Sequence, residues 1–128
     1  MSYVPYKNGT LFIPSGPSGD HLFVIVTPEC TEGCHLLVSF SSIKKNVSHD
    51  PTCILQPGAH PFIKQPTYML YRMAQITPAA WLTKMVDGWV YRKGNDDASD
   101  ELVATIRTGV MDSPFTPQRV VEYCAKAP

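Results

Sequence analysis

Two short polar stretches hold the densest group of side chains that could do acid–base chemistry. One is Ser48-His49-Asp50-Pro51-Thr52-Cys53, and the other is Gly58-Ala59-His60-Pro61. A carboxylate beside an imidazole can hold its tautomer and orientation, so His49 next to Asp50 has the composition of an acid–base pair. An Asp before Pro also opens turns, because its carboxylate binds the backbone two residues on. The tripeptide by itself favours the turn over catalysis.

Arg72 is the second candidate, since it stands among aromatic and apolar residues. If residues 68–76 form one strand, alternation places Tyr68, Leu70 and Arg72 on the same face. A charge within an apolar strand must reach solvent or find a partner. We therefore expect Arg72 either on a solvent-facing side or in a concave site, where its guanidinium could hold a phosphate through two hydrogen bonds.

Further candidates lie at predicted strand ends and in loops. They comprise an imidazole, two hydroxyls and three ammonium groups: His21, Ser41, Ser42, Lys44, Lys45 and Lys64. Each one alone is typical of a solvated rim. Binding and catalytic residues gather on the loops of a rigid scaffold, however, and these candidates all come from such positions. Together they predict one polar rim on a small domain.

The four cysteines are Cys30, Cys34, Cys53 and Cys124. Free thiols are the default in a reducing compartment, and Cys34 and Cys53 lie in apolar stretches that favour core positions. The alternative is a zinc site that draws on Cys30, Cys34, His35, His49 or Cys53, although only Cys30 and Cys34 have a regular ligand spacing. A Cys30–Cys34 disulfide would require export of the chain. We expect no metal or other cofactor.

Composition limits the class of protein. The chain has 128 residues, 44% of them apolar and 17% charged, which is typical of one globular domain. Eleven basic and eleven acidic residues leave a formal net charge of zero. A chain that binds nucleic acid through bulk charge would be basic, so a nucleic-acid role here needs a local patch. The 12 prolines disfavour long helices.

No apolar run approaches the ~18 residues that a membrane span needs. The longest, Leu22-Phe23-Val24-Ile25-Val26, has the length of a strand. The first seven residues have no basic stretch followed by an apolar one, as a secretory leader would. We therefore expect a cytoplasmic location and no membrane partner.

Short strands are predicted over the first two-thirds of the chain. Apolar runs bounded by Gly, Pro and Asp predict strands at residues 11–14, 21–27, 35–40, 52–55 and 68–76. On the third of these, Leu36, Val38 and Phe40 would share one face, with Leu37 and Ser39 on the other. Strands this short and close leave no room for parallel crossovers, so we expect a small antiparallel barrel or sandwich.

The remaining third of the chain is predicted to be helical. Thr77-Pro78 has the pattern of a helix cap followed by a first-turn proline, and residues 79–86 would form that helix. Residues 94–97 would cap a second helix over residues 97–111, whose apolar face is Leu102, Val103, Ile106 and Val110. Residues 116–125 would form a last short helix. The whole chain, 1–128, is then one α+β domain, with a β-barrel core at 10–76 and a helical part at 77–128.

The order of these elements resembles that of the PemK/MazF-like toxins of bacterial toxin–antitoxin systems, over roughly residues 10–86. The resemblance rests on element order and on the ends of strands, such as Val38-Ser39-Phe40-Ser41-Ser42. It implies a small antiparallel SH3-like β-barrel and a homodimeric, metal-independent endoribonuclease. It also implies two partners, single-stranded RNA and a neutralising antitoxin.

The resemblance carries over to particular residues only in part. Ser41-Ser42 match the family's Thr-Ser at the end of the third strand, whereas His21-Leu22 stand where the family has Arg-Pro. Arg72 lies about two residues before the family's strand arginine. On this basis we expect His49 or His21 as acid or base, Arg72 as phosphate stabiliser and a serine as positioning hydroxyl. Lys44, Lys45 and Lys64 would extend the positive groove for RNA.

A different class of function fits the same residues. Small barrels often bind peptides in aromatic-lined grooves without catalysis. Zero net charge and the many aromatic residues favour such a module. In that case the helices at 97–111 and 116–125 would supply the surface for a protein partner or for a second copy of the chain.

Overall fold

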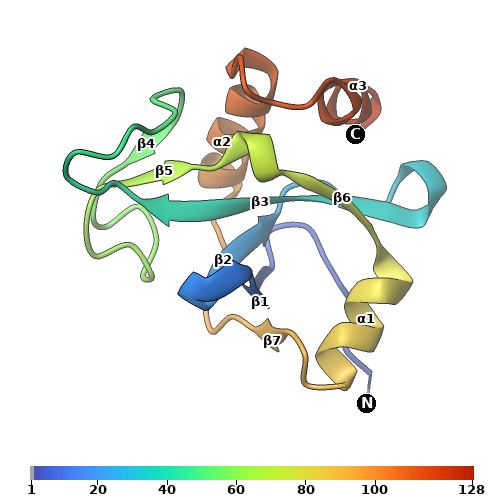
Figure 1. The fold of residues 1–128 in the computed structure, drawn as a ribbon. Coiled ribbons are helices and arrows are strands. Elements are labelled where there is room, and N and C mark those ends of the chain that lie inside the picture. The colour runs from blue at the N-terminus through green and yellow to red at the C-terminus, as the bar shows by residue number, and fades with distance from the viewer. Residues whose placement is uncertain (1) are drawn as a thin grey trace.

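The longest strand, β3 (Cys34–Ser42), organises the structure, a computed structural model that describes residues 2–128 (Figure 1). It belongs to a seven-stranded sheet in the order β4-β5-β3-β2-β1-β7, with β6 paired to β3 beside that path. All strand pairs are antiparallel. The other strands are β1 (Thr10–Pro14), β2 (Asp20–Ile25), β4 (Ile54–Leu55), β5 (Thr67–Met69), β6 (Gln75–Pro78) and β7 (Arg92–Lys93).

Three α-helices complete an α+β domain, the class that the sequence predicts. They are α1 (Ala79–Asp87), α2 (Asp100–Asp112) and α3 (Gln118–Lys126). Three single 3-10 turns, η1 (Gly16–Ser18), η2 (Thr31–Gly33) and η3 (Tyr71–Met73), join strands. The sheet continues past residue 76, since β6 runs to Pro78 and β7 follows α1. No helix formed by residues 2–128 is long and apolar enough to cross a bilayer.

The strand predicted at 68–76 is two strands with a turn between them. β5 pairs with the last residues of β3, β6 pairs with its first residues, and η3 separates the two. Tyr71 causes the break, because its ring is fully buried and its hydroxyl donates to the carbonyl of Ile106 on α2 at 2.9 Å. The sequence showed the apolar run and the helix, but not that the helix packs against Tyr71 and draws it out of line.

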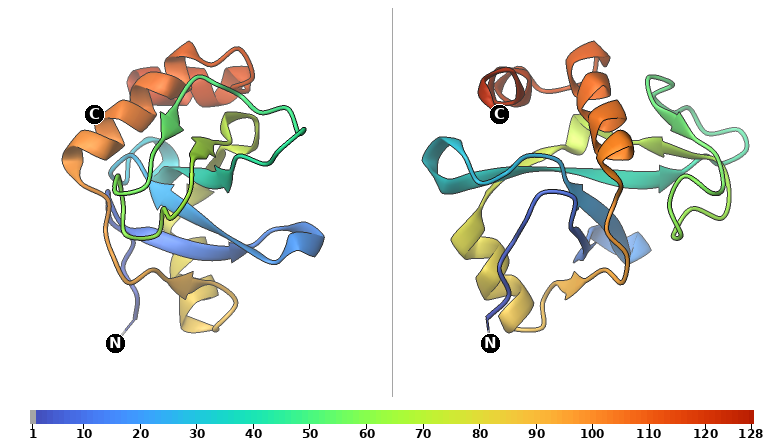
Figure 2. Two further views of the ribbon diagram at one scale, coloured as in Figure 1. Left: turned by 90° about the vertical axis from the view of Figure 1, so that its left-hand side faces the viewer. Right: turned by 180° about the vertical axis from the view of Figure 1, so that it is seen from behind.

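The side chains of β3 alternate between two faces as predicted, and both faces are buried. Leu36, Val38 and Phe40 belong to the large core beneath α2 and α3, whereas Leu37 belongs to a smaller core with Leu82 of α1. Figure 1 shows α2 and α3 on one side of β3 and α1 on the other. The sheet is therefore covered on both sides along the centre of β3. Its C-terminal end, with β4, β5 and their loops, extends beyond α1 (Figure 2).

The predicted apolar face of α2 is confirmed, because Leu102, Val103, Ile106 and Val110 are all buried. On α3, Val120, Tyr123 and Cys124 are buried in the same core. These helices bury their apolar faces against the sheet. Their outward faces, which include the exposed Met111, take no part in this packing, so a partner surface on these helices stays a prediction.

Two predicted helix caps are wrong. α2 is capped by Ser99, whose hydroxyl accepts from the amide of Leu102 at 3.1 Å, so the helix begins three residues later than predicted. Asp97 instead accepts a hydrogen bond from the hydroxyl of Tyr6. Thr77 does not cap α1, since it pairs with His35 as part of β6 and Pro78 occupies the cap position. In both cases pairing with distant residues overrides the local signal.

Candidate functional site

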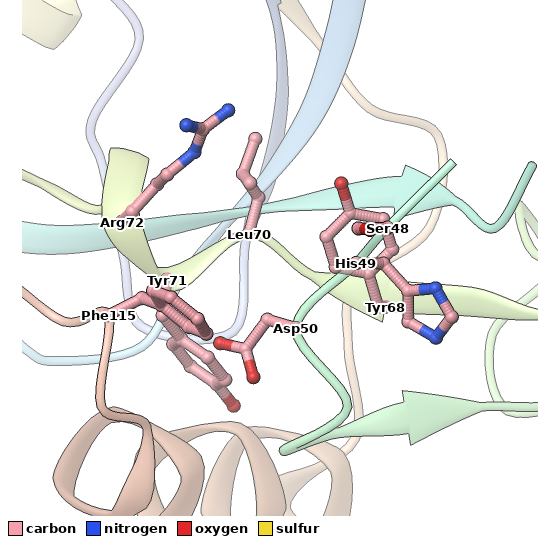
Figure 3. A pocket seen from close by; sticks show the side chains of 8 residues that line it. All are labelled: Ser48, His49, Asp50, Tyr68, Leu70, Tyr71, Arg72 and Phe115. Carbon is pink, nitrogen blue, oxygen red and sulfur yellow. The ribbon is translucent and has the colours of Figure 1, made fainter. Parts of the chain in front are cut away.

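A hollow of about 270 Å³ lies at the end of β3 where β5 meets η3. It brings together the loop after β3, the β5–η3 segment and the connection between α2 and α3. Its lining residues are Ser48, His49, Asp50, Tyr68, Leu70, Tyr71, Arg72 and Phe115 (Figure 3). Two of the predicted catalytic residues, His49 and Arg72, thus line one hollow although 22 intervening residues separate them in the sequence.

Asp50 builds a turn, as the alternative interpretation of His49-Asp50-Pro51 predicts. One carboxylate oxygen accepts from the amide and the hydroxyl of Thr52 at 2.9 and 2.6 Å. The other accepts from the hydroxyl of Ser113 at 2.6 Å, and Ser113 follows the last residue of α2. Asp50 is 8% exposed. It therefore fastens the loop that carries His49 to the end of a helix.

The hydrogen bonds decide the charge state of Asp50. Burial by itself raises the pKa of the carboxyl, but the bonds from Ser113 and Thr52 and the nearby His49 lower it more. The net effect places the pKa of Asp50 below its ordinary value. Asp50 is thus a carboxylate at neutral pH and its work there is structural.

Asp50→Asn is expected to destabilise the protein by about 1.5–3 kcal/mol at pH 7, because it weakens charge-assisted hydrogen bonds in a buried turn. The pKa of Asp50 is lower in the folded state, so its stabilisation is complete above the ordinary aspartate pKa of ~3.9. That stabilisation is lost as the pH falls through the folded pKa.

Urea unfolding of the wild type and the variant at pH 7 and near pH 3 checks this. The difference between them should shrink at the lower pH. Glu122→Gln, at an exposed carboxylate on α3, is the matched control and should change stability little at pH 7. A difference that stayed constant with pH would contradict the assignment.

His49 turns away from Asp50 and lies against Tyr68 (Figure 3). The two ring centres are 5.4 Å apart and the rings are inclined by 40°. The imidazole is half-buried, so it is held in place and still reaches solvent. The acid–base pair suggested by the adjacent residues His49 and Asp50 is therefore not formed. Tyr68 holds the imidazole of His49 in place, a role that the sequence suggests for Asp50.

Arg72 lies in η3 rather than within a strand, so strand alternation does not place it. It still lines the same hollow as Tyr68 and Leu70. Its side chain is exposed, and in Figure 3 Leu70 stands between it and His49. The hollow thus has an imidazole at one end and a permanent cation at the other.

A second hollow, of about 210 Å³, holds most of the remaining candidates. His21, Ser41, Ser42 and Lys44 line it together. The pairing of β2 with β3 ends at Phe23 and Ser39, and the residues just beyond it, His21 on β2 and Ser41 on β3, both line this hollow. The predicted catalytic residues are therefore divided between two hollows, His49 and Arg72 in one, and His21 and the serines in the other.

The two hollows adjoin at one cross-strand pair. Ser41 on β3 is paired with Tyr68 on β5, and residues directly opposite each other share a face of the sheet. Ser41 and Tyr68 are therefore neighbours, with the ring of His49 against Tyr68. His21 and His49 line different hollows.

The two other cations lie outside these hollows. Lys64 lines a third hollow with Phe12, His60 and Phe62, and Lys45 is exposed on the loop after β3. Sequence reasoning missed Phe115 and the positioning role of Tyr68. Phe115 reaches the site only because α2 folds back over the sheet, and no local signal foretells that. The sequence did place Tyr68 on the same face of the predicted strand as Arg72.

The cysteines are free thiols, and Cys34, Cys53 and Cys124 are buried as the core interpretation predicts. The thiol of Cys30 lies 2.9 Å from the hydroxyl of Tyr123 on α3. Within residues 2–128 no three His, Cys, Asp or Glu side chains converge in a way that could hold a metal ion. The residues proposed for zinc are dispersed, and His35, for example, bonds the carbonyl of Thr27 through Nδ1.

Comparison with known proteins adds no assignment to this geometry. No protein-family model matches the chain, and no curated protein shows significant sequence similarity to it. The function is therefore argued from the residues of the site.

Proposed function

We propose that this protein is a toxin-like, metal-independent endoribonuclease that cuts single-stranded RNA. The observation that carries the proposal is the shared hollow of His49 and Arg72, with Ser41 next to it through its pair with Tyr68. The proposal includes the SH3-like barrel of the PemK/MazF-like toxins. It is supported by β3, which pairs along one edge with β2 and along the other with β6 and then β5.

The chemistry needs three contributions. A base must take the proton of a ribose 2′-hydroxyl, a cation must stabilise the charge on the phosphorane, and a proton must reach the 5′ leaving oxygen. His49 is a half-buried imidazole, the side chain that most often acts as a general base, so it suits the base. Arg72 offers a planar fork that matches a phosphate. The 2′ oxygen bonds to phosphorus while the bond from phosphorus to the 5′ oxygen breaks. The 5′ oxygen takes a proton from solvent water, and the other product ends in a cyclic phosphate.

Residues of the second hollow would bind rather than react. His21, Ser42 and Lys44 line the second hollow, whereas His49 and Arg72 line the first. Ser41 pairs with Tyr68, against which His49 lies, and would position the ribose or phosphate through its hydroxyl. Single-stranded RNA suits this site, because its unpaired bases and its backbone can adapt to several adjoining hollows.

The direct test is incubation of the purified protein with mixed-sequence RNA in excess EDTA. Discrete fragments that end in cyclic phosphate are expected. A cooperative thermal melt of the same sample shows that the protein is folded. A folded sample that leaves the RNA intact at high protein concentration would overturn the proposal.

A second candidate function, binding of a protein partner without catalysis, is favoured by one surface. Trp89 is 93% exposed and has a left-handed backbone with φ of 64°, an arrangement that costs energy in a residue other than Gly. Val90, the next residue, is also exposed, and the exposed Trp81 on α1 donates its indole N–H to the hydroxyl of Tyr91 at 3.4 Å. We call Trp81, Trp89 and Val90 the tryptophan patch.

If the tryptophan patch binds a second copy of the chain, the protein sediments as a dimer at micromolar concentration. Trp89→Ala is then expected to shift it to a monomer, because exposed Trp residues supply much of the energy of small interfaces. Met111→Ala, at an exposed apolar residue on α2, is the control and should remain a dimer. Equal sedimentation of wild type and Trp89→Ala would remove this candidate.

A further inference from the structure

The third and largest hollow, of about 410 Å³, is lined by aromatic and basic side chains. Its lining residues are Thr10, Phe12, Leu22, His60, Pro61, Phe62, Lys64, Gly94, Asn95 and Asp96. Leu22 and Phe62 also line the hollow that holds His21, Ser41 and Lys44. Phe62 thus joins the third hollow to the second. The Ser41–Tyr68 pair joins the second hollow to the first, which His49 lines.

Phe62 is an exposed ring that the fold holds in one orientation. It is 46% exposed, and its amide donates to Nδ1 of His60 at 3.1 Å. The bond from the amide assigns the proton of His60 to Nε2, which lies 3.1 Å from the carbonyl of Asp96. The imidazole also stacks on Phe40 at 6.0 Å. His60 thus fixes the start of the segment that presents Phe62.

The ring of Phe62 is supported by other aromatic rings. Phe12 meets it edge to face at a centre distance of 5.7 Å, and Phe40 lies tilted at 6.5 Å. The guanidinium of Arg92 covers the ring of Phe12 at 4.1 Å. A ring held in this way loses little conformational freedom when a flat ligand stacks on it.

The charges around Phe62 fit an anion that is bound mainly by stacking. Three cations, Lys44, Lys64 and Arg92, stand around the two hollows on either side of the ring. Asp20 and Asp96 line the same hollows, so the excess of positive charge is small. A ligand that combines flat rings with spaced negative charges matches this surface, and single-stranded RNA has that composition.

We propose that Phe62 is a base-stacking residue for a nucleotide of the bound RNA, with Lys64 and Lys44 contacting phosphates on either side of that base. This inference rests on the proposed function for the identity of the ligand. It adds a binding site separate from the reacting group. It also explains how a chain with zero net charge could hold RNA, since stacking on a ring does not depend on bulk charge.

The test measures binding without cleavage. A fluorescently labelled ten-nucleotide RNA with 2′-O-methyl groups cannot be cut by 2′-hydroxyl attack, so its anisotropy reports binding alone. Phe62→Ala is expected to raise the Kd roughly tenfold or more, and Phe62→Trp to keep or improve the affinity. Lys64→Gln should weaken binding less and reduce its dependence on salt.

Met111→Ala is the matched control, since Met111 is also an apolar residue with 46% exposure and lies on α2. It should bind like the wild type. The inference is overturned if Phe62→Ala binds like Met111→Ala, or if the wild type does not bind the oligonucleotide at micromolar concentration. Binding that depends on Phe62 in a protein that leaves unmodified RNA intact would support the inference and overturn the nuclease. Cleavage of RNA by a protein whose affinity for the oligonucleotide does not depend on Phe62 would support the nuclease and overturn the inference.

Discussion

His49→Ala is expected to slow the cleavage of RNA in EDTA by roughly 10²- to 10⁴-fold, the usual contribution of a general base. We expect no second imidazole to replace His49, because no other histidine lines its hollow and His21 lines the neighbouring one. The loss should appear in kcat, with little change in the Kd for the 2′-O-methyl oligonucleotide. Single-turnover cleavage followed on a gel measures it.

Two comparisons make this prediction specific. Arg72→Ala should cost roughly 10²- to 10³-fold, as the loss of one donor to a developing oxyanion does, and Arg72→Lys should recover only part of it. His21→Ala should change binding more than kcat, since His21 lies away from the reacting group. If His21→Ala removed cleavage and His49→Ala left it intact, the two histidines would exchange roles and the site would centre on the second hollow.

Gly109→Ala is expected to destabilise the protein by about 2–4 kcal/mol, although alanine is the better helix former. Gly109 lies within α2 directly against Tyr71, and a Cβ there would overlap the Tyr71 hydroxyl and ring. The overlap would also disturb the bond from that hydroxyl to the carbonyl of Ile106. The midpoint of urea unfolding should fall accordingly.

Thr108→Ala is the control for this effect, since Thr108 is the exposed neighbour of Gly109 on the same helix and should change stability little. Tyr71→Phe removes the hydroxyl that the new methyl would strike. The double variant with Gly109→Ala should therefore be more stable than the sum of the two single changes predicts. Strict additivity would show that the helix and Tyr71 do not meet as described.

This contact also links stability to the site. Tyr71 is buried beside Arg72, and both belong to η3, so the packing of Tyr71 on α2 sets where the guanidinium lies. Gly109→Ala should therefore lower RNA cleavage in protein that is still folded. We expect this loss of cleavage to come from a displaced Arg72 and not from a change at His49.

Local patterns in the sequence were sufficient to predict most of the elements. Alternation predicted which side chains of β3 share a face, and the spacing of Leu102, Val103, Ile106 and Val110 predicted the buried side of α2. The Asp-Pro pair predicted the Asx turn at Asp50. Each of these signals depends on residues a few positions apart, whose energies are set by backbone geometry and burial.

The candidate site depended on contacts between residues far apart in the chain. His49 and Arg72 were each recognised by type, but only the meeting of the loop after β3 with η3 brings them to one hollow. Tyr71 broke the predicted strand because α2, more than thirty residues later, offers it a buried acceptor. Composition and periodicity determined an α+β domain of short strands and three helices. Tertiary packing decided which side chains share a hollow, because burial and hydrogen bonding across the chain outweigh local preference.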